Sequence, residues 1–214
     1  MALRVSEIFL SIQGESTHAG RLCVFVRLAG CNLSCVYCDT EYAAKGAGSP
    51  LSVSQIMAKV ELFGVKLVEL TGGEPLSQPA SAELIAAFAD NGFEVLVETN
   101  GTVDIGHFDR RAKYIVDIKT PGSGQGGSFL VANYEKLKSS DEVKFVITSR
   151  MDFDWAVDIV RERGLAQKLT VLFSPADGFV TLKELAGWII EDKTPARMNI
   201  QMHKVIWGQG ARGV

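Results

Sequence analysis

The chain has 214 residues, 47% hydrophobic and 22% charged, and these are ordinary values for a globular protein. Its net charge of −3 argues against a broad nucleic-acid-binding surface, and no apolar run approaches the ~20 residues that cross a bilayer. The length predicts one domain over residues 1–214, and the N-terminus lacks the apolar segment of a signal peptide.

Short apolar runs alternate with helical segments along the chain. Strands are predicted at residues 5–12, 22–28, 65–70, 93–98, 114–119, 142–148, 169–173 and 198–203. Helices are predicted at about 52–63, 81–91, 152–163 and 181–191, and turn chemistry at 46–50. This alternation favours an α/β fold with a parallel sheet, and the shortage of full helices predicts an incomplete or distorted (β/α)6-type partial barrel.

Polar and glycine-rich segments follow the predicted strands. They occupy residues 31–38, 71–75, 98–102, 117–121 and 174–177. Barrel enzymes place their chemistry at the carboxyl ends of the strands, so these segments are expected to converge at one mouth.

Three of the four cysteines lie close together, with Cys31, Cys35 and Cys38 at spacing C-x3-C-x2-C. Three such thiolates can bind three irons of a 4Fe–4S cluster and leave the fourth iron open for chemistry. Cys23 lies in an apolar strand and is interpreted as a small buried hydrophobe. A zinc site would need a distant histidine, and disulfides would leave one thiol unpaired, so the cluster is favoured and the cytoplasm is the expected compartment.

The cysteine loop, with Tyr37 before its last cysteine, resembles that of the radical S-adenosylmethionine (SAM) enzymes. Thr71-Gly72-Gly73-Glu74-Pro75 resembles the second motif of that superfamily, which holds the SAM amino group. The resemblance implies that SAM chelates the fourth iron. It also implies that reductive cleavage of SAM gives a 5′-deoxyadenosyl radical, which abstracts a hydrogen atom.

Residues 7–16, 38–40 and 201–204 extend this likeness over nearly the whole chain, which is similar to the 7-carboxy-7-deazaguanine synthases. The resemblance implies conversion of 6-carboxy-5,6,7,8-tetrahydropterin to 7-carboxy-7-deazaguanine with loss of ammonia, a step toward queuosine and other deazapurines. It implies a 4Fe–4S cluster, SAM and Mg²⁺ as cofactors and a homodimer as the assembly. The expected partners are the pterin and an electron donor such as flavodoxin or ferredoxin, without nucleic acid or membrane.

The resemblance also implies a role for individual residues. The cluster ligands are Cys31, Cys35 and Cys38, and the magnesium ligand is Thr40. The SAM contacts are Tyr37, Cys38, Asp39, Gly73, Asp117, Lys119, Ser174, Pro175, Ala176 and Asp177. The substrate contacts are Ile12, Gln13, Gly14, Glu15, Arg27, Thr71 and His203.

Several of these roles have a physical basis and a plainer alternative. Arg27 is a charge inside an apolar strand, and either a substrate carboxylate or an internal salt bridge would satisfy it. The hydroxyl of Thr40 suits a hard cation but is also common in turns. Gly73 would let the backbone approach a ligand closely. A lone strand histidine such as His203 is often structural.

Two other functions compete with the synthase. A glycyl-radical-enzyme activase shares the short core and the cysteine spacing but acts on a protein partner; the segment 13–15 with Arg27 favours a small heterocycle instead. A non-catalytic iron–sulfur or zinc module is disfavoured by the motif at 71–75 and by the other strand-end segments.

Overall fold

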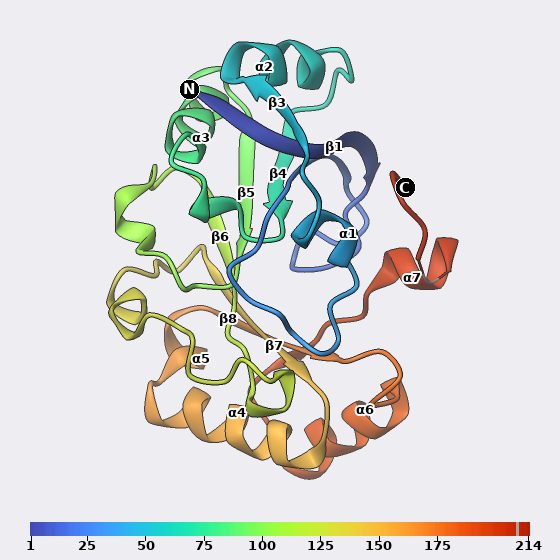
Figure 1. Cartoon of the computed structure of the whole chain (residues 1–214). Helices are drawn as coiled ribbons and strands as arrows, with labels where there is room; N and C mark the ends of the chain where they lie inside the picture. The colour runs from blue at the N-terminus through green and yellow to red at the C-terminus, as the bar shows by residue number, and fades with distance from the viewer. Residues whose placement is uncertain (209) are drawn as a thin grey trace.

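The computed structural model describes residues 1–208 and 210–214 (Figure 1). In this part of the chain, nine strands form one sheet in the order β3-β1-β2-β4-β5-β6-β7-β8-β9. Their bounds are β1 Ala2–Ile12, β2 Leu22–Leu28, β3 Ser49–Ser52, β4 Leu67–Gly72, β5 Glu94–Thr99, β6 Lys113–Asp117, β7 Glu142–Ile147, β8 Thr170–Pro175 and β9 Arg197–Met198. Strand β2 and strands β4 to β9 run parallel, whereas β1 and β3 are antiparallel additions. The sheet does not close, which confirms the predicted incomplete barrel.

The described helices lie around this curved sheet. Their bounds are α1 Glu41–Ala44, α2 Val53–Glu61, α3 Ser81–Asp90, α4 Arg150–Glu162, α5 Leu165–Lys168, α6 Leu182–Glu191 and α7 Met202–Trp207. Figure 1 shows α2 and α3 near one end of the sheet and α4, α5 and α6 together at the other. None of the described helices combines the length and apolarity needed to cross a membrane.

Two of the predicted helix starts are fixed by capping boxes. The Ser52 hydroxyl accepts a hydrogen bond from the Gln55 backbone at the start of α2. The Thr181 hydroxyl accepts one from the Glu184 backbone at the start of α6. In both boxes the third residue bonds back to the cap, so two otherwise unpaired backbone donors are satisfied.

The inner face of the sheet carries an apolar layer with charged residues above it. Cys23, Leu67, Leu96 and Ile115 form the buried layer, which confirms the interpretation of Cys23 as a small hydrophobe. Successive residues of a strand point to opposite faces, so residues two positions further along these strands also face inward. These positions hold Phe25, Glu69, Glu98 and Asp117.

The segment between β1 and β2 crosses the inside of the barrel near its base. The Gln13 amide donates a hydrogen bond to Glu69 on β4. The Thr17 hydroxyl bonds Glu142 at the start of β7, and Arg21 pairs with Glu94 at the start of β5. The segment between β1 and β2 is therefore the floor of the barrel interior.

Two sequence predictions were wrong in part. Turn chemistry around Pro50 lies at the beginning of β3, an edge strand that pairs with β1 alone, where the missing proline N–H is tolerated. The last predicted strand, 198–203, ends at Met198, and His203 lies in α7 instead. A short apolar run is compatible with the residue period of a strand and with that of a helix. Here the Met202 N–H donates a hydrogen bond to the Gly14 carbonyl, which fixes the first turn of α7 against the barrel.

Candidate active site

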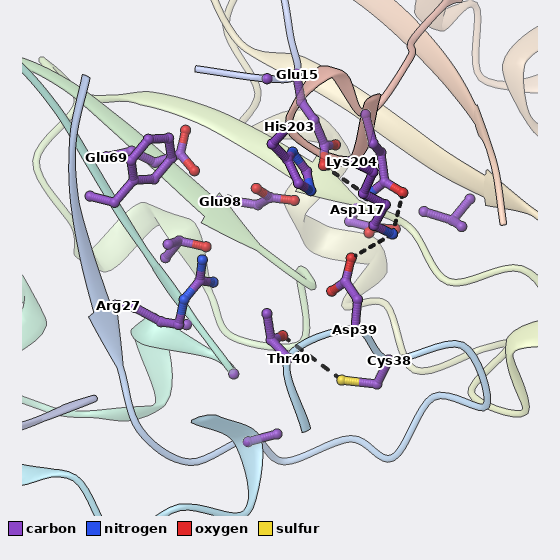
Figure 2. Close-up of a pocket in the computed structure, with 18 of the residues that line it drawn as sticks. Glu15, Arg27, Cys38, Asp39, Thr40, Glu69, Glu98, Asp117, His203 and Lys204 are labelled. Carbon is purple, nitrogen blue, oxygen red and sulfur yellow. Dashed lines mark hydrogen bonds and ion pairs between the residues drawn. The ribbon is translucent and has the colours of Figure 1, made fainter. Parts of the chain in front are cut away.

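A cavity of about 300 Å³ opens at the carboxyl ends of the strands (Figure 2). This volume is at the lower end of the range for small-molecule sites. The predicted site residues that line it are Ile12, Gln13, Gly14, Glu15, Arg27, Cys31, Cys35, Tyr37, Cys38, Asp39, Thr40, Thr71, Gly73, Asp117, Lys119, Ala176, Asp177 and His203. Ser174 and Pro175 do not line it, and the Ser174 hydroxyl accepts a hydrogen bond of 2.8 Å from Asn199 instead.

The cysteine loop presents Cys31, Cys35 and Cys38 to this cavity as free, half-buried thiols. Burial raises the pKa of the Cys31 and Cys35 thiols, and bound metal would reverse that effect because it deprotonates its thiol ligands. Among the described residues, no group of three His, Cys, Asp or Glu side chains lies close enough together to bind a single metal ion. Thiolates that bind three different irons of one cluster need no such convergence, so the loop fits a 4Fe–4S cluster better than mononuclear zinc.

The segment 71–75 packs against the cysteine loop and bonds to the residue before it. A Cβ atom on Gly73 would lie 2.6 Å from the Gly30 carbonyl carbon and 2.7 Å from Cys31 Cβ, so this position requires glycine. The Glu74 backbone N–H donates to Gly30 O at 2.9 Å, while its buried carboxylate accepts from the Thr99 hydroxyl and the Asn100 N–H at 2.8 and 2.7 Å. The motif thus joins the cysteine loop to the end of β5.

We expect Gly73→Ala to destabilise the protein by about 1–3 kcal/mol, because the added methyl group must displace backbone rather than a flexible side chain. The displaced loop should also hold less iron. The control is Gly187→Ala in α6, where a Cβ meets no atom within 4 Å. Urea unfolding and iron content of the reconstituted proteins test this, and equal iron content in the two variants would contradict it.

Two buried polar atoms of the cavity lack a partner among the described residues, the Tyr37 hydroxyl and Asp117 Oδ1. The other Asp117 oxygen accepts from Lys119 Nζ at 2.8 Å. Burial opposes the charge of Lys119, but Asp117 and Tyr37 more than offset it and raise the lysine pKa. Unpaired buried polar atoms call for a ligand with hydrogen-bonding groups.

Lys144 of β7 lies at the centre of the barrel interior. Its ammonium group contacts Glu15 at 2.9 Å and also pairs with Glu98, and Asp117 lies 3.8 Å away. Burial works against the charge of Lys144, but these carboxylates raise its pKa well above the usual value. Burial likewise would raise the pKa of Glu15, but Lys144 and Gln201 together hold it at about 2. Glu15 and Lys144 are therefore both charged at neutral pH.

Arg27 has an internal partner and still faces the cavity. Its Nε donates to Glu7 Oε1 at 2.7 Å, and the Tyr42 hydroxyl bonds the same oxygen at 2.5 Å. This is the internal salt bridge that the sequence analysis gave as one of two possible partners of Arg27. Within the described residues the two terminal guanidinium nitrogens have no hydrogen-bond partner, so they are available to a carboxylate in the cavity (Figure 2).

Helix α7 closes the side of the cavity opposite Arg27. A Cβ on Gly14 would lie 2.7 Å from His203 Nδ1, so glycine lets the helix approach the loop after β1. Burial lowers the pKa of His203, which favours the neutral imidazole. Lys204 pairs with Asp39 at 2.9 Å and connects the helix to the cysteine loop (Figure 2).

The residues after α7 also reach the cavity. Gly208 and residues 210–214 line its edge, and the Arg212 guanidinium lies 4.0 Å from the centre of the Tyr42 ring. At this distance a cation–π contact holds the end of the chain against the segment that follows the cysteine loop.

Comparisons with known proteins identify the family of this chain. Residues 26–121 match the Radical SAM superfamily. The chain is 40% identical to the 7-carboxy-7-deazaguanine synthase of Koribacter versatilis, with 99% of this chain and 100% of the relative covered. It is 41% identical to the 7-carboxy-7-deazaguanine synthase of Chlorobaculum tepidum, with 99% and 97% covered. The chain belongs to the 7-carboxy-7-deazaguanine synthase family.

Solved structures show the same fold as this 7-carboxy-7-deazaguanine synthase family member. The crystal structure of QueE from Escherichia coli superposes with a TM-score of 0.76 at 22% identity, and the match covers 95% of each chain. SuiB from Streptococcus suis, solved with bound S-adenosylmethionine, gives a TM-score of 0.51 at 14% identity over 80% of this chain and 44% of that chain. The family and fold predicted from the sequence are thereby confirmed.

Sequence reasoning missed part of the site of this 7-carboxy-7-deazaguanine synthase family member. Glu69 and Lys144 line the cavity although they lie in no segment predicted to reach it, and Glu98 begins the predicted segment 98–102 but was given no role of its own. Each is a charged residue within an apolar strand, which is the signal that identified Arg27. Gln201 lies on the segment 198–203 that was predicted as a strand and Lys204 follows that segment, and their contacts with Glu15 and Asp39 were not predicted.

Proposed function

We propose that the protein converts 6-carboxy-5,6,7,8-tetrahydropterin to 7-carboxy-7-deazaguanine with release of ammonia, by radical SAM chemistry. The observation that carries this proposal is that the cysteine loop and a charged barrel interior face one cavity of about 300 Å³. The relatives named above, whose length the chain matches, support the same reaction.

Different residues of the chain would bind the cluster, the substrate and SAM. Cys31, Cys35 and Cys38 would hold a 4Fe–4S cluster, which with SAM supplies hydrogen-abstracting radical chemistry when bound. The free nitrogens of Arg27 would bind the substrate carboxylate, and the backbone of residues 12–14 would bind the heterocycle. Asp117 would accept hydrogen bonds from SAM through its unpaired oxygen.

Three finer features belong to the same proposal. Thr40 lines the cavity beside Asp39, and its hydroxyl would bind a magnesium ion that also contacts the substrate carboxylate. Ser174 to Asp177 would pass near SAM through Ala176 and Asp177. The working protein would be a homodimer that receives electrons from a small carrier such as flavodoxin or ferredoxin.

An anaerobic assay tests the proposal. The protein with its cluster reconstituted is mixed with SAM, dithionite, Mg²⁺ and 6-carboxytetrahydropterin, and the products are identified by mass. We expect 7-carboxy-7-deazaguanine and ammonia in equal amounts, and slower formation when Mg²⁺ is omitted. Deoxyadenosine without deazaguanine would overturn the substrate assignment and favour an activase that acts on a protein.

A further inference from the structure

Glu69 is a buried carboxyl group of the barrel interior. It lies on β4 and lines the cavity, and the residue is 2% exposed. Its direct neighbours on the adjoining strands are Phe25 of β2 and Leu96 of β5. Phe25 stacks on Phe9 with ring centres 5.1 Å apart, so the neighbour of Glu69 on β2 belongs to an aromatic pair.

The pairing of Glu69 differs from that of the other acidic groups nearby. Glu15 and Glu98 each pair with Lys144, and Asp117 pairs with Lys119. Within the described residues, Glu69 has no Lys, Arg or His within ion-pair distance, and its partner is the neutral Gln13 amide. Figure 2 shows it across the cavity from Glu15, with Glu98 between them.

These surroundings favour the protonated form of Glu69. Burial raises its pKa well above the usual value, and the carboxylates of Glu98 and Glu15 raise it further. The charges of Lys144 and Arg27 act in the opposite direction without reversing the shift. A carboxylic acid that stays neutral near pH 7 can donate a proton to a leaving group.

We propose that Glu69 is the acid–base residue of the step that releases ammonia, an inference that rests on the function proposed above. As the carbon–nitrogen bond breaks, its electron pair stays on nitrogen, and Glu69 supplies the proton that turns the departing amine into ammonia. The resulting Glu69 carboxylate then removes a proton from the adjacent ring carbon. The electron pair of that carbon–hydrogen bond forms the new ring double bond and Glu69 regains its proton, so the step needs no oxidant or reductant.

Glu69→Gln in the reconstituted enzyme separates this step from the radical chemistry. With substrate deuterated at the carbon that bears the carboxylate, E69Q should still transfer deuterium into SAM. Deazaguanine formation should fall by about 100-fold or more, and a compound one ammonia heavier than the product should accumulate. Glu94→Gln, a neutralised carboxylate paired with Arg21 outside the cavity, is the control and should match the wild type.

The pH profile gives a second readout. Turnover of the wild type should fall as pH rises through the pKa of Glu69, because the acid form is required when ammonia leaves. Glu69→Asp keeps a carboxyl group and should keep this alkaline decline, whereas E69Q should lose it. A role confined to holding Gln13 in place would leave the profile of all three proteins the same.

Thermal unfolding tests the protonation of Glu69 without any turnover. The folded pKa lies above the unfolded value, so the wild type loses stability as pH rises from about 4.3 toward the folded pKa. Glutamine does not titrate, and the Tm advantage of E69Q over the wild type should therefore grow between pH 5 and pH 8. A constant Tm difference over this range would contradict a protonated Glu69.

The outcomes separate this inference from the proposed function. A wild type that forms no deazaguanine overturns both. Suppose that the wild type forms deazaguanine. The role of Glu69 is then overturned if E69Q forms product within about threefold of the wild-type rate, or if E69Q is equally slow in deuterium transfer and in product formation. Both results leave the proposed function standing. Retained deuterium transfer with lost ammonia release, together with the changed pH profile, supports it.

Discussion

Cys35→Ala is expected to lower deazaguanine formation by at least about 1,000-fold, the scale of loss when one member of an essential unit is removed. The cluster would keep two protein ligands where the loop offers three, so iron content and its visible absorbance should fall with activity. Cys35 is half-buried at the cavity edge rather than in the core, so the fold should persist.

The matched control is Cys23→Ala. Cys23 is fully buried in the apolar layer with Leu67, Leu96 and Ile115, and it does not line the cavity. This variant should lose some stability but bind as much iron as the wild type and retain its activity. Equal loss of iron in both variants would show that the C-x3-C-x2-C loop is not the cluster site.

Lys144→Met is expected to destabilise the protein by about 3–5 kcal/mol at neutral pH, because it leaves Glu15 and Glu98 buried without their cation. In the wild type, Lys144 helps to hold the pKa of Glu15 at about 2, below its unfolded value. That contribution to stability is present above the unfolded pKa and is lost as pH falls through about 2. Loss of the lysine therefore costs most near pH 7 and less near pH 4, where unpaired carboxylates can take up protons.

Urea unfolding at pH 7 and at pH 4.5 measures this difference. The control is Lys45→Met, which removes an exposed pair with Glu41 four residues away and should change stability by no more than about 0.5 kcal/mol. A Lys144→Met protein that unfolds at the same urea concentration as the Lys45→Met protein would show that the buried charges are not coupled as the structure indicates.

Local patterns were sufficient to predict most of the elements. The boundaries of β2 and the caps of α2 and α6 agree with the structure because apolar runs and capping boxes act over a few residues. Edge elements were harder. Pro50 was assigned to a turn because an edge strand and a turn both tolerate a missing N–H, and only the pairing of β3 with β1 decides between them.

The partners of the charged residues in the barrel also depend on strand pairing, which the local sequence does not determine. Arg27 was singled out as a charge in an apolar strand, but the residue that pairs with it, Glu7, lies on a neighbouring strand. Glu69 and Lys144 carry the same signal, yet their different surroundings arise from strand register. Lys144 lies opposite Asp117, whereas Glu69 lies between Phe25 and Leu96.

The sequence by itself determined the chemistry of this protein. The spacing of Cys31, Cys35 and Cys38 and the segment 71–75 indicate a cluster and SAM, because ligand type and short-range spacing are properties of the local chain. The tertiary structure alone decided which side chains share the cavity and in which charge state. The helical position of His203, the contact of Lys204 with Asp39 and the hydrogen bond of Glu69 with the neutral Gln13 amide depend on segments far apart in the chain. Burial and neighbouring charge set these properties, and both exist only once the sheet has formed.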